Sequence, residues 1–274
     1  MYIFMSNFTI GVFDSGMGGL TAVTALSGLL PHADIVYFGD TGHMPYGGRS
    51  REQLLYMARK NIAFLEAQGA GLILAACGTV TSVALDTVSK ETKTPLLGVA
   101  QPAAETAKKL TENGVVGFIA TQACVDSGFN QALLERAIPG VRVIARACPR
   151  FVPLIESGVC TGSSHELRSA IEEYLRDIKA AGADTVILGC THYPLIAGAI
   201  QEYLGENVKL ISSSGEAARA LAEKLSGRQP EDGTRGRHIY YTSGDGTQFA
   251  ALAETLLARP LDGPVIQLEP YPLI

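Results

Sequence analysis

The chain has 274 residues, of which 47% are hydrophobic and 18% charged, so it can form one large domain or two of ordinary size. Its net charge of −5, without a long basic run, argues against nucleic acid as a partner, because phosphate binding needs clustered lysine and arginine side chains. The longest apolar runs, such as residues 71–77, are far shorter than a membrane span. Residues 1–8 lack the basic region of a signal peptide and are predicted to lead into the first strand.

The cysteines are odd in number and no CxxC pair occurs among them. They are Cys77, Cys124, Cys148, Cys160 and Cys190. This usage argues against a disulfide framework and against a zinc site. It favours a reducing compartment, for which the cytoplasm is the default expectation.

Strand-like and helix-like segments alternate along the first hundred residues. Short apolar runs predict buried strands at residues 8–14, 33–40, 71–77 and 95–100. Helical patterns follow the first three of these strands, at residues 21–30, 51–69 and 79–90.

The same alternation continues in the second half of the chain. Further strands are predicted at residues 115–121, 141–147, 184–190 and 208–214, and helices at residues 103–114, 129–140 and 165–182. Strands separated by helices of this length indicate an α/β fold with parallel sheets, in which ligands bind beyond the carboxyl ends of the strands. The polar, glycine-rich residues 226–237 are predicted to form an exposed loop.

Two cysteines stand where a predicted strand stops, in ILAACGTVT (73–81) and VILGCTHYP (186–194). Cys77 and Cys190 each precede a predicted helix start, where free backbone amides stabilise a thiolate and lower the thiol pKa. Either cysteine alone could be a small core residue, but the matching context of the two favours a chemical role. The other three cysteines lack this context and are predicted to be structural.

Three further features could serve the same site. His192 follows Cys190 by two positions and could relay a proton, although a helix cap or a buried imidazole is the alternative. Asp14 and Ser15 end the first strand in FDSGMGGL (13–20), where they could meet a ligand or cap the next helix. The loop GDTGHMPYGGRS (39–50) could hold a carboxylate with backbone N–H groups, or could simply connect a strand to a helix.

Two thiols that face each other suggest racemisation of a carbon acid. A thiolate on one side removes the α-proton, and a thiol on the other side returns one. Each thiol should come from a separate half of the chain, so that the substrate lies between them. Neither a lysine signature for pyridoxal phosphate nor a metal-ligand spacing occurs, so no cofactor and no metal is expected.

The sequence resembles the glutamate racemases of the aspartate/glutamate racemase superfamily, over almost the whole chain from Thr9. The matching stretches are FDSGMGGL (13–20), GDTGHMPYGGRS (39–50), AACGTVTS (75–82), ACPRFVPLIESG (147–158), LGCTHYPLI (188–196) and HIYYTSGD (238–245).

The resemblance implies two similar α/β domains with mostly parallel sheets and an active site in the cleft between them. The first domain would comprise residues 1–99 and 215–274 and carry Cys77, and the second would comprise residues 100–214 and carry Cys190. The implied activity is cofactor-independent interconversion of L- and D-glutamate, with D-glutamate supplied to bacterial peptidoglycan synthesis. A homodimer is also expected.

The resemblance further assigns roles to single residues. Cys77 would act on the D-isomer and Cys190 on the L-isomer, with Asp14 and His192 assisting the thiols and Glu156 supporting His192. The residues implied to frame the substrate are Asp14, Ser15, Tyr46, Gly47, Gly78, Thr79, Thr191 and His192.

Some positions depart from the family pattern. Gly78 stands where the family has asparagine after the first cysteine, Ser213 replaces an aspartate, and His43 and Met44 differ from an expected basic residue. Racemisation of another amino acid, or of a derivative such as a hydantoin, is therefore an alternative. A non-catalytic binding protein on the same fold is a second alternative. A cysteine hydrolase that uses Cys190 and His192 is a third, but it leaves Cys77 unexplained.

Overall fold

The computed structural model describes residues 9–159, 164–226 and 234–273 of the chain. The predicted lead-in of residues 1–8, Cys160, and residues 227–233 of the predicted exposed loop lie outside the described residues. The described remainder of that loop, residues 226 and 234–237, belongs to no helix or strand.

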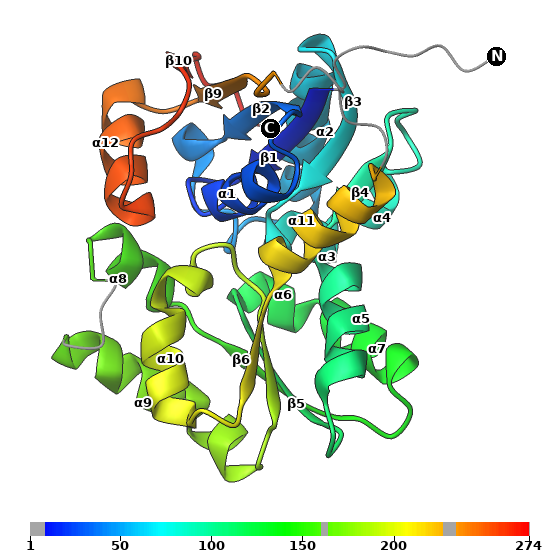
Figure 1. Ribbon diagram of the computed structural model, residues 1–274, viewed down its shortest axis with the longest axis vertical. Coiled ribbons are helices and arrows are strands. Elements are labelled where there is room, and N and C mark those ends of the chain that lie inside the picture. Colours follow the sequence, from blue (N-terminus) through cyan, green and yellow to red (C-terminus); the bar gives the residue numbers. More distant parts are fainter. Residues whose placement is uncertain (1–8, 160–163, 227–233, 274) are drawn as a thin grey trace.

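Six parallel strands form the larger sheet, which combines segments from both ends of the chain (Figure 1). In spatial order they are β10 (Val265–Gln267), β9 (His238–Thr242), β2 (Asp34–Gly39), β1 (Thr9–Asp14), β3 (Ala70–Ala75) and β4 (Leu96–Gly98). Its helices are α1 (Leu20–Leu29), the short 3₁₀ helix η1 (Thr41–His43), α2 (Arg51–Ala67), α3 (Gly78–Val83), α4 (Leu85–Val88) and α12 (Gly246–Leu257).

Four parallel strands form the smaller sheet, which lies below the larger one in Figure 1. Their spatial order is β6 (Arg142–Ala147), β5 (Val115–Ala120), β7 (Thr185–Leu188) and β8 (Lys209–Ser212). Its helices are α5 (Ala100–Leu110), α6 (Gln122–Asp126), α7 (Phe129–Ala137), α8 (Phe151–Glu156), α9 (His165–Ala180), the 3₁₀ helix η2 (Tyr193–Ile196) and α10 (Ala197–Leu204). Helix α11 (Ser213–Lys224) follows β8 along the chain but packs on the larger sheet.

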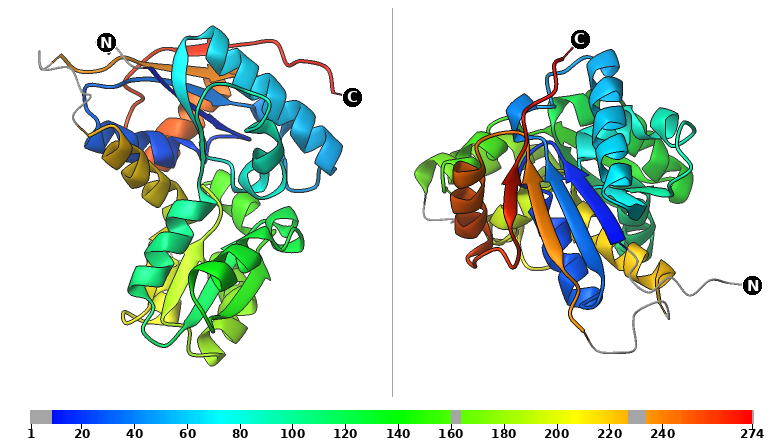
Figure 2. Two further views of the ribbon diagram at one scale, coloured as in Figure 1. Left: turned by 90° about the vertical axis from the view of Figure 1, so that its right-hand side faces the viewer. Right: turned by 90° about the horizontal axis from the view of Figure 1, so that it is seen from above.

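Helices cover both faces of each sheet, so the molecule has two three-layer units, seen one above the other in the left view of Figure 2. On the larger sheet, α1, α11 and α12 pack on one face and α2 on the other. On the smaller sheet, α8, α9 and α10 cover one face and α5 and α7 the other. Helix α11 packs against both α1 and α5, and so joins the two units. The predicted α/β class with two units of parallel strands is confirmed.

The predicted strands appear within a few residues of their expected bounds, but several helices differ. The predicted helix at residues 79–90 is divided at Ala84 into α3 and α4. Elements α6, α8, α10, α12 and β10 were not predicted, and α11 begins where the last strand was expected to end. Helices α6 and α8 have five and six residues, which is too short for a hydrophobic repeat to be recognised.

The registers of the strands bring the predicted site residues to one edge of each sheet. Asp14 pairs with Gly39, and Phe13 pairs with Ala75, so the carboxyl ends of β1, β2 and β3 lie level. In the smaller sheet the carboxyl ends of β5 and β7 are similarly level, because Ile119 pairs with Leu188. The loops that follow these strands are therefore the positions from which a site can be built.

Candidate active site

A cavity of about 520 Å³ lies between the carboxyl ends of the two sheets. The larger sheet contributes loops after β1, β2 and β3, and the smaller sheet contributes loops after β5, β6 and β7. Every residue predicted for the site lines this cavity: Asp14, Ser15, Tyr46, Gly47, Cys77, Gly78, Thr79, Glu156, Cys190, Thr191 and His192. Segments that are more than a hundred residues apart in the sequence therefore share one site.

The two thiols are almost fully buried, with 4% of Cys77 and 8% of Cys190 exposed. Burial, and then the charge of the neighbouring Asp14, raise the pKa of Cys77 from 9.0 to about 12, against hydrogen bonds from the Val80 amide and the Ser15 side chain. Burial also raises the pKa of Cys190 well above its ordinary value, although the His192 amide lowers it. The predicted lowering of the thiol pKa is therefore wrong, because the loss of hydration outweighs the few amides at each strand end.

His192 lies between the second thiol and a carboxyl group. Its Nδ1 is 3.9 Å from Cys190 Sγ, and its Nε2 is 3.0 Å from Glu156 Oε1. The imidazole is 3% exposed, whereas the Glu156 side chain reaches solvent in part. This arrangement can pass a proton between the buried thiol and a carboxyl group nearer to solvent.

Asp14 is the buried acid beside the first thiol. Its Oδ2 accepts hydrogen bonds from the Gly19 amide at 3.0 Å and the Gly16 amide at 3.3 Å. Its Oδ1 has no hydrogen-bond partner within the described part of the chain. Burial raises the pKa of Asp14, against the electrostatic influence of His192 and the loop amides. A buried carboxyl oxygen on the cavity wall without a donor can receive one from a substrate or from a thiol.

The glycine loop after β1 brings the two units into contact. A side chain at Gly18 would lie 2.3 Å from Thr191 Oγ1 and 2.5 Å from His192 Nδ1, so only glycine allows this approach. Nearby, Thr21 Oγ1 donates to the Thr191 carbonyl at 3.1 Å. The first glycine loop therefore helps to hold the segment that carries Cys190 and His192.

Threonines from both units also meet at the cavity wall. Thr79 Oγ1 is 3.0 Å from Thr121 Oγ1, which in turn lies 3.1 Å from the thiol of Cys124. Thr121 was not predicted as a site residue, and neither was its neighbour Gln122. Thr121 ends the predicted strand at 115–121 and Gln122 follows it, so the rule that ligands lie beyond strand ends would have identified them.

Gly78 departs from the family pattern at a point where the two units touch. A Cβ atom at Gly78 would lie 2.3 Å from the carbonyl oxygen of Gly189, which precedes Cys190. The backbone segments that carry the two thiols are thus in direct contact at this pair of glycines.

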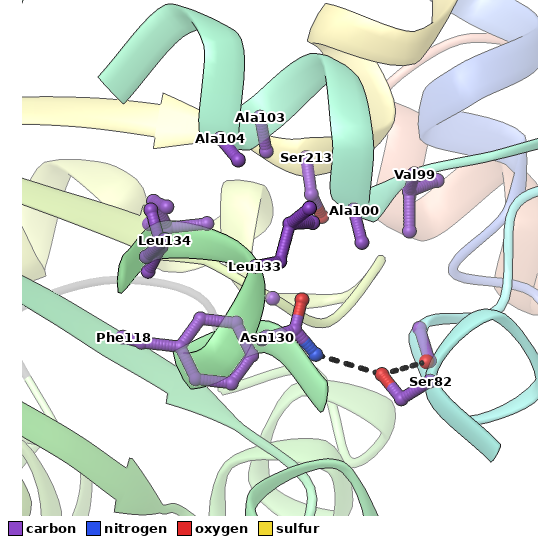
Figure 3. Close-up of a pocket in the computed structure, with 13 residues that line it drawn as sticks. Ser82, Val99, Ala100, Ala103, Ala104, Phe118, Asn130, Leu133, Leu134 and Ser213 are labelled. Carbon is purple, nitrogen blue, oxygen red and sulfur yellow. Dashed lines mark hydrogen bonds between the residues drawn. The ribbon is translucent and has the colours of Figure 1, made fainter. Parts of the chain in front are cut away.

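Behind Gly78 lies a separate, small enclosed space, which Figure 3 shows together with Ser213. There the side-chain amide of Asn130 donates from Nδ2 to Ser82 Oγ at 2.8 Å. Ser213 donates to the Leu188 carbonyl at 2.8 Å and does not line the larger cavity. Its neighbour Ser212 accepts from the Gly215 amide at 3.1 Å and caps α11, a role that aspartate also fills. The exchange at Ser213 therefore cannot act on a substrate by direct contact.

The Asp/Glu/Hydantoin racemase family model matches residues 24–221 of the chain. The chain belongs to this family. A glutamate racemase of Desulforudis audaxviator is 37% identical over 265 residues, which cover 93% of this chain and 96% of that relative.

Solved structures of racemases share the fold. Glutamate racemase from Thermus thermophilus, in complex with β-chloro-D-alanine, is 37% identical with a TM-score of 0.84, and the match covers 96% of this chain and 97% of that one. Glutamate racemase from Francisella tularensis, in complex with D-glutamate, is 31% identical with a TM-score of 0.87 and covers 96% and 98%.

Further residues of this racemase family member line the cavity without having been predicted. They include Pro45, Gly48, Cys148, Pro149, Val152, Pro153 and Tyr193. Cys148 was expected to be structural, and burial raises its pKa well above the ordinary thiol value. Among the described residues, His, Cys, Asp and Glu side chains form no group of three or more that could hold a metal ion. None of the described helices is long and apolar enough to cross a membrane.

Proposed function

We propose that this racemase interconverts L- and D-glutamate, with Cys77 and Cys190 as the proton-transferring groups. The observation that carries the proposal is the placement of two buried thiols, one from each sheet, on the wall of one cavity. The Desulforudis relative named glutamate racemase and the Francisella racemase solved with D-glutamate support glutamate as the substrate.

The reaction moves one proton on and one proton off the same carbon. One cysteine, as the thiolate, removes the proton from Cα of glutamate, and the bond electrons remain on the carbon. The other cysteine, as the thiol, gives its proton to the opposite face of that carbon. After one turnover the two cysteines have exchanged protonation states, so the enzyme is ready for the reverse direction. Cys77 would act on the D-isomer and Cys190 on the L-isomer.

Because burial raises the pKa of both thiols, formation of a thiolate needs assistance. Asp14 lies near Cys77, and His192 lies 3.9 Å from Cys190 and contacts Glu156. We propose that Asp14 accepts the thiol proton of Cys77 and that His192 accepts that of Cys190, each for part of the reaction. Glu156 would orient the imidazole of His192. Ser15, Tyr46, Gly47, Gly78, Thr79 and Thr191 would then frame the amino acid.

The proposal extends to the organisation of the protein. The strands of each sheet fall within the expected domains, residues 1–99 with 215–274 and residues 100–214. Its product, D-glutamate, would enter peptidoglycan synthesis in the cytoplasm, and the working form would be a homodimer. The cysteine-hydrolase hypothesis is disfavoured, because it gives Cys77 no role on the wall that it shares with Cys190.

Circular dichroism with L- and D-glutamate tests the proposal directly. We expect the wild-type protein to racemise both isomers, and Cys77→Ala and Cys190→Ala each to lose at least about a thousandfold in kcat, because each removes one of the two proton-transferring groups. In deuterium oxide the product should carry deuterium at Cα. A fully active single variant, or retention of the original hydrogen, would exclude the two-thiol mechanism. Turnover of another amino acid but not glutamate would favour the alternative substrate.

A further inference from the structure

A buried carboxyl group anchors the loop that carries Tyr46 and Gly47. Asp40 is fully buried directly after β2. Its Oδ1 accepts hydrogen bonds from His43 Nδ1 at 2.7 Å and Ser243 Oγ at 2.6 Å. Its Oδ2 accepts from the hydroxyl of Tyr46 at 2.5 Å and from that of Tyr271 at 2.6 Å. Two of the four donors therefore come from segments near the end of the described chain.

His43 joins the same loop to the backbone of Tyr271. Its Nδ1 faces the Asp40 carboxyl group, and its Nε2 lies 2.7 Å from the Tyr271 carbonyl oxygen. Both partners are acceptors, so a ring nitrogen of His43 that carries a proton can donate to the one it faces. The Tyr271 ring also packs on the imidazole, with the ring centres 4.3 Å apart. Tyr271 thus contacts the loop through its hydroxyl, its ring and its carbonyl.

The segment around Tyr271 is fixed to the larger sheet and to α2. The Leu268 amide donates to the Thr242 carbonyl at 2.8 Å, at the end of β9. The Tyr56 hydroxyl of α2 donates to the Pro272 carbonyl at 3.1 Å. In Figure 2 this C-terminal segment, coloured red, runs past α2. It is therefore a strap held at both ends, with Tyr271 placed against the loop.

The loop offers backbone groups to the cavity, because its tyrosine hydroxyl is already used. Tyr46 is 2% exposed and donates to Asp40, so its hydroxyl is not available to a substrate. Gly47 and Gly48 line the cavity, and within the described part of the chain their amides donate to no protein acceptor. Free amides of this kind bind carboxylates. Burial, and then the charge of Asp40, raise the pKa of both Tyr46 and Tyr271 well above the ordinary value, so both phenols remain donors at neutral pH.

We propose that Tyr271 is a positioning residue for substrate binding, which acts through Asp40 and His43 to fix the amides of the loop at residues 46–48. The inference rests on the proposed function, since it takes this loop to hold a carboxylate of the substrate. One residue of this cluster, His43, stands at a position where the sequence departs from the family pattern. The contact of Tyr271 with His43 is therefore inferred from this chain and not from the family. Tyr271 itself does not line the cavity.

Tyr271→Phe tests this role with a minimal change, because it removes the hydroxyl and retains the ring and the carbonyl. We expect KM for L- and D-glutamate to rise roughly three- to tenfold, with kcat changed by less than about twofold, because the thiols are untouched. Ser243→Ala removes another of the four donors and should act in the same direction. Tyr241→Phe is the matched control, since its hydroxyl donates to Gln68 at 3.0 Å on the exposed side of the same unit.

Amide hydrogen exchange supplies a readout that does not depend on activity. Peptides from residues 40–49 should exchange faster in Tyr271→Phe than in wild type or Tyr241→Phe, while the melting temperature shows that each variant is folded. Unchanged exchange and KM, or a fall in kcat alone, would overturn the positioning role. If the wild-type protein does not racemise glutamate, the proposed function fails, and the exchange comparison still decides whether Tyr271 holds the loop.

Discussion

At the scale of single residues, Gly78 decides how closely the two thiol-bearing segments can approach. The resemblance would place asparagine at this position, where its side chain would help to hold the substrate. In this chain an added Cβ would lie 2.3 Å from the Gly189 carbonyl oxygen, and 3.6 Å from the Cys124 thiol. Because that carbonyl belongs to the backbone before Cys190, it can move away only if the second thiol moves with it.

We therefore expect Gly78→Ala and Gly78→Asn to lower kcat/KM for glutamate by roughly tenfold or more, since overpacking of this kind costs about 1–3 kcal/mol. Steady-state kinetics by circular dichroism measures the effect. Gly198→Ala is the control, because nothing lies within 4 Å of a Cβ added at this exposed position of α10. A lower KM in Gly78→Asn would contradict this expectation. It would mean that the two segments separate to admit the side chain, and that glycine binds glutamate less well than the asparagine of the family pattern.

At the scale of elements, the start of α2 fixes one end of the loop at residues 39–50. Ser50 accepts a hydrogen bond from the Gln53 amide at 3.3 Å, and the Gln53 side chain accepts one from the Ser50 amide at 3.3 Å. This reciprocal cap ends the loop at a defined residue. The other end follows directly from β2, so the loop is held by a strand, a helix cap and the Asp40 cluster.

Ser50→Ala should lower the free energy of unfolding by about 1 kcal/mol, the usual cost of a lost N-cap, and should also raise KM modestly because it loosens the loop. Chemical denaturation and glutamate kinetics measure the two effects. Ser164→Ala removes the equivalent cap of α9, where the side chain accepts from the Leu167 amide at 3.4 Å far from this loop. It should cost similar stability with no change in KM. Equal KM changes in both variants would contradict the specific role of the α2 cap.

At the scale of the whole molecule, folding buries ionisable groups that single segments would leave in water. Each thiol follows its own strand and is almost fully buried in the folded chain, Cys77 in the core of the larger unit and Cys190 in the core of the smaller unit. The pKa of Cys77 is raised from 9.0 to about 12 as a result. The folded protein therefore holds this proton in a range of pH where the unfolded chain releases it.

Stability should consequently fall as the pH rises from about 9 towards 12. A raised folded-state pKa contributes stability that is fully present below the unfolded value of 9.0 and is lost as the pH passes through the folded value. The free energy of unfolding, measured by denaturant titration at a series of pH values, gives the slope. The slope is proportional to the number of protons that the chain releases on unfolding, and Cys77→Ala should lower this number by up to one. An unchanged slope would show that the thiol of Cys77 titrates normally in the folded state.

Features that depend on neighbouring residues could be predicted from the sequence. Apolar runs separated by helical repeats predict the strands. The residues directly after them are expected to form a site, and they line one cavity in the structure. Cys77, Cys190, Asp14 and His192 were recognised in this way, because a strand end is defined by a few consecutive residues. Short helices such as α6 and α8 were missed, because one turn and a half carries no periodic signal.

The interactions between distant segments follow from the packing of the folded chain. This packing reversed the expected direction of the thiol pKa values, because the burial of each thiol depends on how distant segments pack around it. It placed Ser213 away from the cavity and Gly78 against Gly189, which no spacing in the sequence reveals. It also brought Tyr271 to Asp40, 231 positions away. Residues far apart in the sequence lose water, touch and form hydrogen bonds with one another only when the chain is packed. These effects therefore depend on the folded structure.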